Sequence, residues 1–493
     1  MTDILFTHSY FLHFDPKELR AHMPYPPLGT ITAAAYLRNK GFSVGLHDVM
    51  LSEQESEIIP ALNLQAPRIV VIYDDCFNYL TKMCLSRMRQ AALQLAFYAK
   101  EKHCTVVVFS SDSADHAEKY LSRNVDYVLC GEGEETLAEL CTLLLRKSGT
   151  DASGIKGLAF RDSTGEVVLT TRRPPIKNLD EIPFPAWDLV DIERYRAIWK
   201  ERHGYFSLNI STTRGCPFHC NWCSKPLYGQ VYNSRSSENV VAEMKFLKTH
   251  IHPDHLWITD DIFGLKPGWI GQFAELVQRE GAAIPFKCLS RVDLLLRDDT
   301  IRHLKTAGCK TVWVGAESGS QKILDAMEKG TTVEEIGQAT EMLRDAGIRV
   351  GFFLQFGYPG ETSEDIEKTV CMVRRLEPDE IGISVSYPLP GTKFYDRVKA
   401  QLGAKQNWET SDDFDPMVQA AFSRQYYHVL HTVVHKRFRI WRGMRTLRDL
   451  SVRPASVNRR SLEILASMMV HGITLPHHLR ALKELERTSP THA

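Results

Sequence analysis

The sequence lacks an excess of charge of either sign, since 60 Lys and Arg residues face 60 Asp and Glu residues. A neutral chain has no global attraction to nucleic acid, so we expect no nucleic-acid partner. No apolar run reaches the roughly 18 residues that span a bilayer. The first residues, MTDILFTHSY, also lack the basic and apolar regions of a signal peptide. We therefore expect a cytoplasmic protein.

The composition also excludes a disordered chain. The 493 residues are 43% hydrophobic and 24% charged, which is typical of a globular protein with two or three domains. Most of the eleven cysteines stand alone in apolar surroundings, as Cys104, Cys130 and Cys309 do. In a reducing compartment such residues behave as small buried hydrophobic side chains.

One cysteine cluster differs from the others. The stretch TTRGCPFHCNWCSKP places Cys216, Cys220 and Cys223 within eight positions, but no fourth cysteine accompanies them. A structural zinc site requires four ligands, and His219 is the one nearby side chain that could complete it. Three cysteines on a cubane 4Fe-4S cluster instead leave one iron open to a substrate or cofactor. We favour the cluster over zinc.

The chain after the cluster alternates between short apolar strands and amphipathic helices. Helical stretches separate the predicted strands, which lie in residues 206–216, 255–263, 285–293, 310–319, 349–361 and 380–392. This alternation predicts a parallel sheet, and six units suggest a partial (β/α)6 TIM-like barrel over residues 196–400. Active residues of such barrels lie at the carboxyl ends of the strands, where the cysteine cluster falls.

A second α/β unit precedes the barrel. Residues 1–150 contain five predicted strands, at 3–10, 43–50, 67–75, 104–112 and 125–134, with helical stretches such as 28–41 and 81–102 between them. This pattern predicts a doubly wound, Rossmann-like sheet that binds a ligand beyond its carboxyl edge. Residues 151–195 are expected to form a hairpin and a proline-rich linker, and residues 401–493 a helical extension.

The spacing C-x3-C-x2-C, with an aromatic residue before the last cysteine, resembles the radical S-adenosylmethionine (SAM) superfamily. The resemblance implies that Cys216, Cys220 and Cys223 hold a 4Fe-4S cluster. It also implies SAM contacts from Trp222, Asp260, Asp261, Arg291 and Glu317. Asp260 and Asp261 are in addition candidate catalytic residues, although they replace a commoner Gly-Gly-Glu pattern. Arg291 can offer its two-pronged guanidinium to the SAM carboxylate.

The stretches YPPLGTITAAAYLRNKGFSV and VDYVLCGEGEETLAEL resemble the cobalamin-binding domain joined to many class B radical SAM methylases. This resemblance implies corrin or nucleotide-tail contacts from Gly29, Ser110, Ser111, Gly131, Gly133 and Glu134. The chain lacks the Asp-x-His-x-x-Gly pattern that supplies a histidine to cobalt in other cobalamin enzymes. If cobalamin binds, we expect no histidine ligand from this domain.

The resemblance implies an enzyme that cleaves SAM to a 5'-deoxyadenosyl radical and, with cobalamin, methylates an unactivated carbon. The expected substrate is a lipid, a tetrapyrrole or a secondary metabolite, and flavodoxin or ferredoxin is the expected electron donor. A cobalamin-independent cyclase, rearrangement enzyme, dehydratase or epimerase remains the alternative. A non-catalytic cobalamin or redox sensor is a more distant one.

The tail contains a distinctive basic segment, in which six Lys or Arg residues between Lys436 and Arg448 alternate with apolar ones. One interpretation is a helix whose basic face is solvated and whose apolar face packs on the barrel. The other is a surface that contacts a membrane peripherally and draws in an anionic or lipid substrate.

Overall fold

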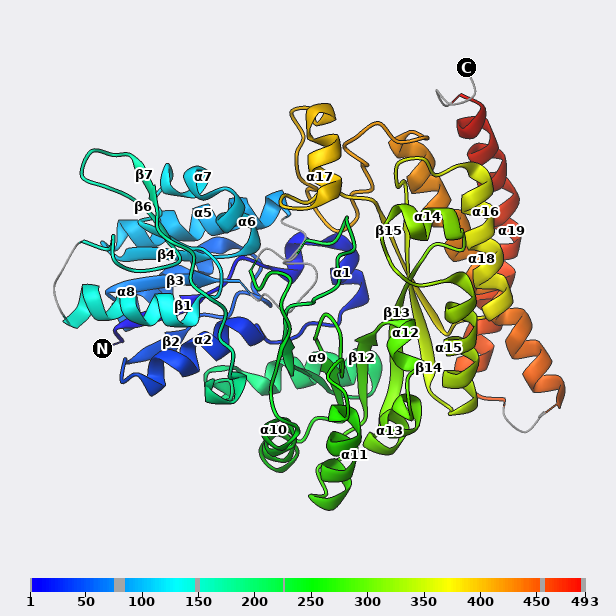
Figure 1. Ribbon diagram of the computed structural model, residues 1–493, viewed down its shortest axis with the longest axis horizontal. Coiled ribbons are helices and arrows are strands. Elements are labelled where there is room, and N and C mark those ends of the chain that lie inside the picture. The colour runs from blue at the N-terminus through cyan, green and yellow to red at the C-terminus, as the bar shows by residue number, and fades with distance from the viewer. Residues whose placement is uncertain (1, 75–84, 147–150, 225–226, 453–456, 489–493) are drawn as a thin grey trace.

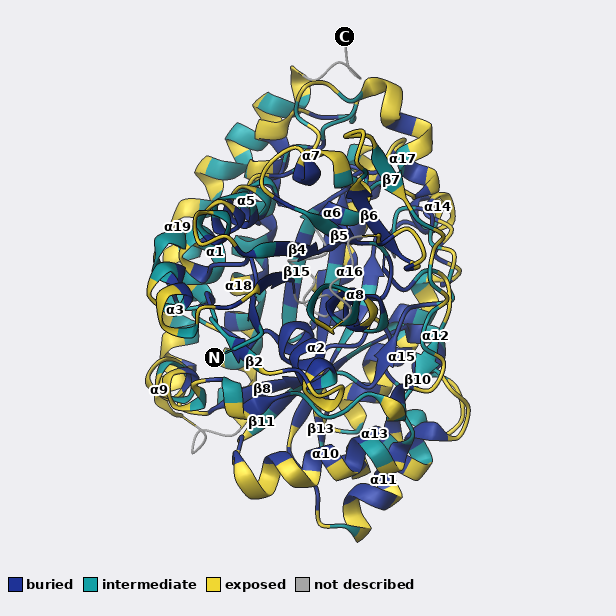
Figure 2. Cartoon of the chain, turned by 90° about the vertical axis from the view of Figure 1, so that its left-hand side faces the viewer, coloured by how far each residue is buried: buried dark blue, intermediate teal, exposed yellow. Residues whose placement is uncertain are grey.

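The computed structural model describes residues 2–74, 85–146, 151–224, 227–452 and 457–488. Figure 1 shows two α/β sheets side by side, with the N-terminal sheet in blue and cyan and the second sheet in green and yellow. The last two helices lie on the far side of the second sheet. In Figure 2 most of the central strands of both sheets are dark blue and buried, whereas the outer faces of the surrounding helices are largely yellow and exposed.

The N-terminal sheet has the predicted doubly wound topology. Its parallel strands run in the order β2-β1-β3-β4-β5, with bounds Val44–Leu46, Ile4–Thr7, Ile69–Tyr73, Thr105–Phe109 and Tyr127–Leu129. Every residue of β1 and β3 is buried, as expected where helices cover both faces of a parallel sheet. The covering helices include α2 (Leu28–Asn39), α5 (Ser86–Glu101) and α8 (Glu134–Arg146).

The predicted hairpin extends this sheet. Strands β6 (Leu158–Arg161) and β7 (Val167–Leu169) continue it beyond β5 in antiparallel register, so the sheet has seven described strands. The structural unit thus reaches past residue 150, where the sequence suggested a boundary. The predicted helix at 81–102 begins at Ser86 in the structure, and its first residues, 81–84, lie outside the described residues.

The second sheet is the predicted half-barrel. Its six parallel strands follow chain order, β8-β11-β12-β13-β14-β15, with bounds Ser207–Ile210, His255–Ile258, Phe286–Ser290, Cys309–Glu317, Arg349–Phe356 and Glu380–Val385. The helices between them are α10 (Ser237–His250), α11 (Trp269–Arg279), α13 (Thr300–Ala307), α15 (Val333–Asp345) and α16 (Ser363–Leu376).

Strand alternation divides the half-barrel into two faces. In β14, Phe352, Leu354 and Phe356 belong to the main hydrophobic core, so they face the helices. Phe353 and Gln355 therefore face the inside of the barrel, where the ring of Phe353 lies 4.7 Å from that of Trp313. The inner face thus combines aromatic surface with polar groups near the carboxyl ends of the strands.

The C-terminal extension packs on the barrel through α18 (Arg424–Val452), which pairs with α19 (Arg459–Arg487) in a helical hairpin. Basic residues of α18 form ion pairs with the barrel. Arg437 pairs with Glu367 at 3.2 Å, Arg445 with Asp379 at 3.1 Å and Arg448 with Glu377 at 3.1 Å. Phe438 of α18 belongs to the main hydrophobic core, as the packing interpretation of this segment expects. That interpretation placed the basic face in solvent, whereas these three basic side chains form ion pairs with the barrel. No helix among the described residues has the length and apolar character that crossing a bilayer requires.

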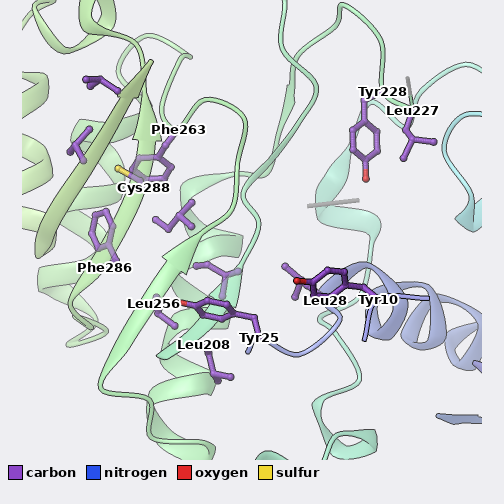
Figure 3. Packing of buried hydrophobic residues seen from close by; sticks show 14 of the residues in the cluster. Tyr10, Tyr25, Leu28, Leu208, Leu227, Tyr228, Leu256, Phe263, Phe286 and Cys288 are labelled. Carbon is purple, nitrogen blue, oxygen red and sulfur yellow. The ribbon is translucent and has the colours of Figure 1, made fainter. Parts of the chain in front are cut away.

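The two sheets share one hydrophobic core. Tyr25, which precedes α2, inserts between Trp199 of α9 (Ile192–His203) and Trp257 of β11, with ring centroids 5.2 and 4.9 Å away. The Tyr25 hydroxyl lies 3.1 Å from Ser207 Oγ in the first barrel strand. Figure 3 shows Tyr25 directed at the barrel strands that carry Leu208 and Leu256. The N-terminal unit thus closes one side of the half-barrel.

A buried ion pair forms the second junction between the two units. Arg214, two residues before Cys216, donates to both carboxylate oxygens of Glu134, at 2.6 and 3.2 Å. Its Nη1 also lies 3.5 Å from Glu132 Oε1, and all three side chains are at most 4% exposed. Glu132 and Glu134 come from the turn after β5. The N-terminal unit therefore holds the backbone just ahead of the cysteines.

We predict that Arg214→Gln lowers the free energy of unfolding by roughly 3–5 kcal/mol near pH 8, because it leaves two buried carboxylates without a cation. Burial already raises the pKa of Glu132 despite Arg214. Without the cation, the folded-state pKa of Glu132 would lie further above its unfolded value, so stability falls as pH rises. The defect should therefore shrink below about pH 5.

Urea unfolding at two pH values measures this effect. Arg38→Gln is the matched control, because Arg38 pairs with Asp188 at the surface, where both side chains are more than 40% exposed. A surface pair contributes little, so this variant should unfold like the wild type. A loss in Arg214→Gln no larger than in the control would contradict the proposed junction.

Candidate active site at the cysteine loop

The cysteine loop, residues 215–224, follows the first barrel strand. After β8 the chain forms the short strand β9 (Thr213–Arg214), which pairs with β10 (Asn233–Ser234). Gly215 has φ +80°, and a Cβ there would lie 2.3 Å from the carbonyl oxygen of Val231. Only glycine fits this turn. It places Cys216 in a buried position, while Cys220 and Cys223 are partly exposed.

Asn221, between the second and third cysteines, fixes the middle of the loop. Its amide nitrogen Nδ2 donates to the Ala326 carbonyl at 2.7 Å, and its backbone N–H donates to the Met327 carbonyl at 3.1 Å. Its Oδ1 accepts from the Tyr358 hydroxyl at 2.9 Å. Sequence reasoning missed this residue, because an asparagine in a loop has no local signal for such contacts.

Asp260, at the end of β11, supports the beginning of the loop. It is 1% exposed, and its Oδ1 accepts from the backbone N–H groups of Thr212 and Thr213 at 2.7 and 3.0 Å. Its Oδ2 accepts from the Thr212 hydroxyl. Burial raises the pKa of Asp260 to about 6, although these hydrogen bonds oppose the rise. Asp261, its neighbour, is exposed. The two candidate aspartates thus lie in different environments.

Arg291, at the end of β12, lies against the loop. Its guanidinium stacks 3.7 Å from the Phe218 ring, and its Nη1 is 3.8 Å from Cys220 Sγ. Its Nε also donates to Asp293 at 2.9 Å. Arg291 is thus 6% exposed and lies beside a cysteine, while its contact with SAM stays a prediction.

Glu317 ends β13 in the left-handed backbone region, with φ +54°. Residues other than glycine and asparagine rarely adopt this conformation, because it strains the backbone. Such strained residues are concentrated at functional sites. Its Oε1 accepts from Lys329 Nζ at 2.7 Å, and both side chains are at most 9% exposed. Burial pulls the pKa of Lys329 down, but Glu317 and Cys220 outweigh it, so the pKa is raised. Lys329 was not among the residues predicted from the sequence.

Trp222 packs beside this pair. Lys329 Nζ lies 5.9 Å from the Trp222 ring, and Trp222 packs against a small hydrophobic cluster of Ile323, Met327, Tyr358, Phe394 and Val398. Its indole nitrogen is buried and has no hydrogen-bond partner among the described residues. Trp222, Arg291, Glu317 and the loop therefore gather at one edge of the half-barrel.

The residues fit a polar ligand above the strand ends. Buried oxygens without a hydrogen-bond partner in the described part of the chain include Gln355 Oε1 and Ser386 Oγ. Unpartnered buried polar atoms are costly and call for a ligand or water. No three His, Cys, Asp or Glu side chains in the described ranges converge on a single metal ion. Cysteines of an iron-sulfur cubane bind separate iron atoms and need no such convergence.

The six predicted cobalamin residues lie in or next to three turns at the carboxyl side of the N-terminal sheet, but several have partners within the protein. Ser110 caps α6 (Ser111–Asp115) by accepting from the Ser113 N–H, and Ser111 begins that helix. A Cβ on Gly133 would lie 2.7 Å from the Tyr73 hydroxyl. Gly131 has φ +93°, Gly29 is buried in the first turn of α2, and Glu134 holds Arg214.

Comparison with known proteins identifies the barrel. Residues 210–373 match the model of the Radical SAM superfamily. An uncharacterised methyltransferase of Pyrococcus horikoshii is 32% identical over 298 residues, which are 60% of this chain and 63% of that protein. Anaerobic magnesium-protoporphyrin IX monomethyl ester cyclase of Rubrivivax gelatinosus is 28% identical over 292 residues, 58% of this chain and 52% of the cyclase. The chain thus spans between half and two thirds of these relatives.

Solved structures match the fold of both units. The cobalamin-dependent SAM radical enzyme OxsB, solved with aqua-cobalamin and SAM, gives a TM-score of 0.69 over 96% of this chain and 71% of OxsB, at 19% identity. The radical SAM methyltransferase TsrM of Kitasatospora setae, solved with cobalamin and a 4Fe-4S cluster, gives 0.65 over 81% of this chain and 78% of TsrM, at 20% identity. Residues 210–373 of this chain therefore match the radical SAM superfamily, and the chain has the fold of the cobalamin-dependent radical SAM enzymes OxsB and TsrM.

Proposed function

We propose that this protein is a radical SAM methylase that binds a 4Fe-4S cluster through Cys216, Cys220 and Cys223. The observation that carries the proposal is the meeting of one of these thiols, Cys220, with Arg291 and with Lys329 of the Glu317–Lys329 pair at the carboxyl edge of the barrel. When bound, the cluster and cobalamin would supply reductive SAM cleavage and methyl transfer to an unactivated carbon, with electrons from a flavodoxin or ferredoxin.

The chain's own residues have distinct roles in this proposal. Arg291 and Lys329 offset the negative charge of deprotonated thiols, because two buried cations lie close to Cys220. Glu317 and Arg291 would orient the polar groups of SAM, and Trp222 would pack against its adenine. Asp260 keeps Thr212 and Thr213, and with them the start of the loop, in place. Trp313 and Phe353 exclude water from the inner face.

Cobalamin would lie beyond the carboxyl edge of the N-terminal sheet, near Gly29, Ser110, Ser111, Gly131, Gly133 and Glu134. The folds of OxsB and TsrM support this location. The contacts of Ser110, Gly133 and Glu134 within the protein favour a second candidate. In that candidate the N-terminal unit is structural, and the barrel catalyses a cobalamin-independent cyclisation or rearrangement. The substrate in either case is a small molecule or lipid.

We expect Cys220→Ala to abolish both the visible absorbance of the anaerobically reconstituted cluster and the formation of 5'-deoxyadenosine, because one of three thiolate ligands is lost. Cys371→Ala is the matched control, since Cys371 is an exposed thiol on α16. That variant should keep wild-type iron content and SAM cleavage. A normal, active cluster in Cys220→Ala would refute the assignment of the cluster ligands.

Two substitutions of Asp260 test whether this residue has a structural or a catalytic role. In Asp260→Asn, the amide oxygen can still accept from the two backbone N–H groups, and the amide nitrogen can donate to the Thr212 hydroxyl. We therefore expect this variant to bind the cluster and cleave SAM within about threefold of wild type. Asp260→Ala leaves these donors unpaired and should cost about 1–3 kcal/mol of stability per buried group. Folded but inactive Asp260→Asn would show that the carboxylate itself takes part in catalysis.

The final measurement decides between the two candidate functions. We predict that hydroxocobalamin co-elutes with the reconstituted protein in gel filtration, and that its spectrum shows no histidine ligand to cobalt. Wild-type SAM cleavage without retained corrin would favour the cobalamin-independent cyclase or rearrangement enzyme. If the protein binds corrin but does not cleave SAM, only a sensor role would remain.

A further inference from the structure

The last helix of the chain, α19, has two apolar faces. Its inner face packs on α18, where Met468 lies so close to Gly443 that a Cβ there would meet Met468 Cβ at 2.5 Å. Leu482 and Leu485, further along, pack against the main hydrophobic core. An amphipathic surface helix needs only one such face, because the opposite side meets water.

The outer face carries a second apolar stripe. Leu462, Met469, Val470 and Ile473 are 57%, 61%, 59% and 81% exposed. Their spacing of seven, eight and eleven residues from Leu462 places them on one side of the helix. Of the sixteen large apolar side chains exposed among the described residues, eight lie between Met444 and Ile473. Exposed apolar residues gathered in this way indicate an interaction surface rather than random scatter.

The hairpin of α18 and α19 that carries the stripe also has an excess of basic residues. Residues 424–487 contain 13 Lys and Arg but 4 Asp and Glu, in a chain whose charges balance at 60 and 60. Arg459 lies three residues before Leu462, and Arg480 lies seven residues after Ile473, so both continue the side of the helix that bears the stripe. Both arginines are exposed. The apolar stripe is therefore flanked by cations at each end.

We propose that the outer face of α19 docks on an anionic lipid bilayer, with the helix lying in the plane of the membrane interface. An apolar face flanked by Arg residues matches acyl chains below and anionic headgroups beside it. A symmetric contact between two copies would instead bring two strongly positive hairpins together, which disfavours a dimer through this face. This proposal does not depend on the proposed methylase function.

Vesicle co-sedimentation of the full chain tests the proposal. The protein should bind vesicles of phosphatidylcholine and phosphatidylglycerol at low salt, and bind pure phosphatidylcholine at least about tenfold more weakly. Met469→Ser/Ile473→Ser and Arg459→Gln/Arg480→Gln should each reduce binding by about tenfold or more. The matched control is Leu64→Ser on α3 (Ile58–Gln65), because Leu64 is an equally prominent exposed side chain at 86%.

Circular dichroism and gel filtration complete the test. The control should bind like the wild type, and each double variant should retain wild-type helicity. If the serine variant does not fold, the arginine variant still decides the outcome, because its side chains lie on the surface. Absence of binding to anionic vesicles, or binding that neither double variant weakens, overturns the proposal. So does a wild-type dimer that the serine variant dissociates, because that result assigns the stripe to a second copy.

Discussion

Charge buried next to the cysteine loop constrains the rest of the structure. A charged group removed from water needs a counter-charge or several hydrogen bonds at close range, or the fold loses several kcal/mol. Arg214 meets Glu132 and Glu134, Lys329 meets Glu317, and the Asp260 carboxylate accepts from Thr212 and Thr213. Each partner comes from a different element, so the loop is positioned only when the elements themselves are assembled.

This constraint explains why two units that could each fold around their own sheet form one core. Arg214 belongs to the barrel, whereas both of its carboxylates belong to the turn after β5. Tyr25 adds an apolar contact, with its ring among barrel aromatics. The electrostatic junction fixes the distance between the units at the loop, and the apolar junction excludes water from the interface. Together they leave little freedom for the cysteines to move relative to the N-terminal sheet.

Much of the fold could be predicted because it depends on local periodicity. Runs such as IVVIY in β3 and the amphipathic stretches between barrel strands identify a parallel α/β protein before any contact is known. Periodicity did not single out Arg291 and Glu317, which were expected at the site from the resemblance to radical SAM enzymes. The partners of these groups could not be predicted, because Lys329 and Glu134 meet their counter-charges only through tertiary packing. The sequence of the β6–β7 hairpin likewise did not predict that this hairpin would join the N-terminal sheet.

The contact of Tyr25 with Ser207 also has a consequence for synthesis on the ribosome. These residues are 182 positions apart, so the N-terminal sheet leaves the ribosome long before its barrel partner exists. Until β8 and β11 emerge, Tyr25 and the adjoining Pro24–Pro26 backbone remain open to water and to other chains. Contacts of such high sequence separation form slowly and leave apolar surface exposed meanwhile. While only the N-terminal unit has been synthesised, its exposed apolar surface can therefore bind chaperones or aggregate with other chains.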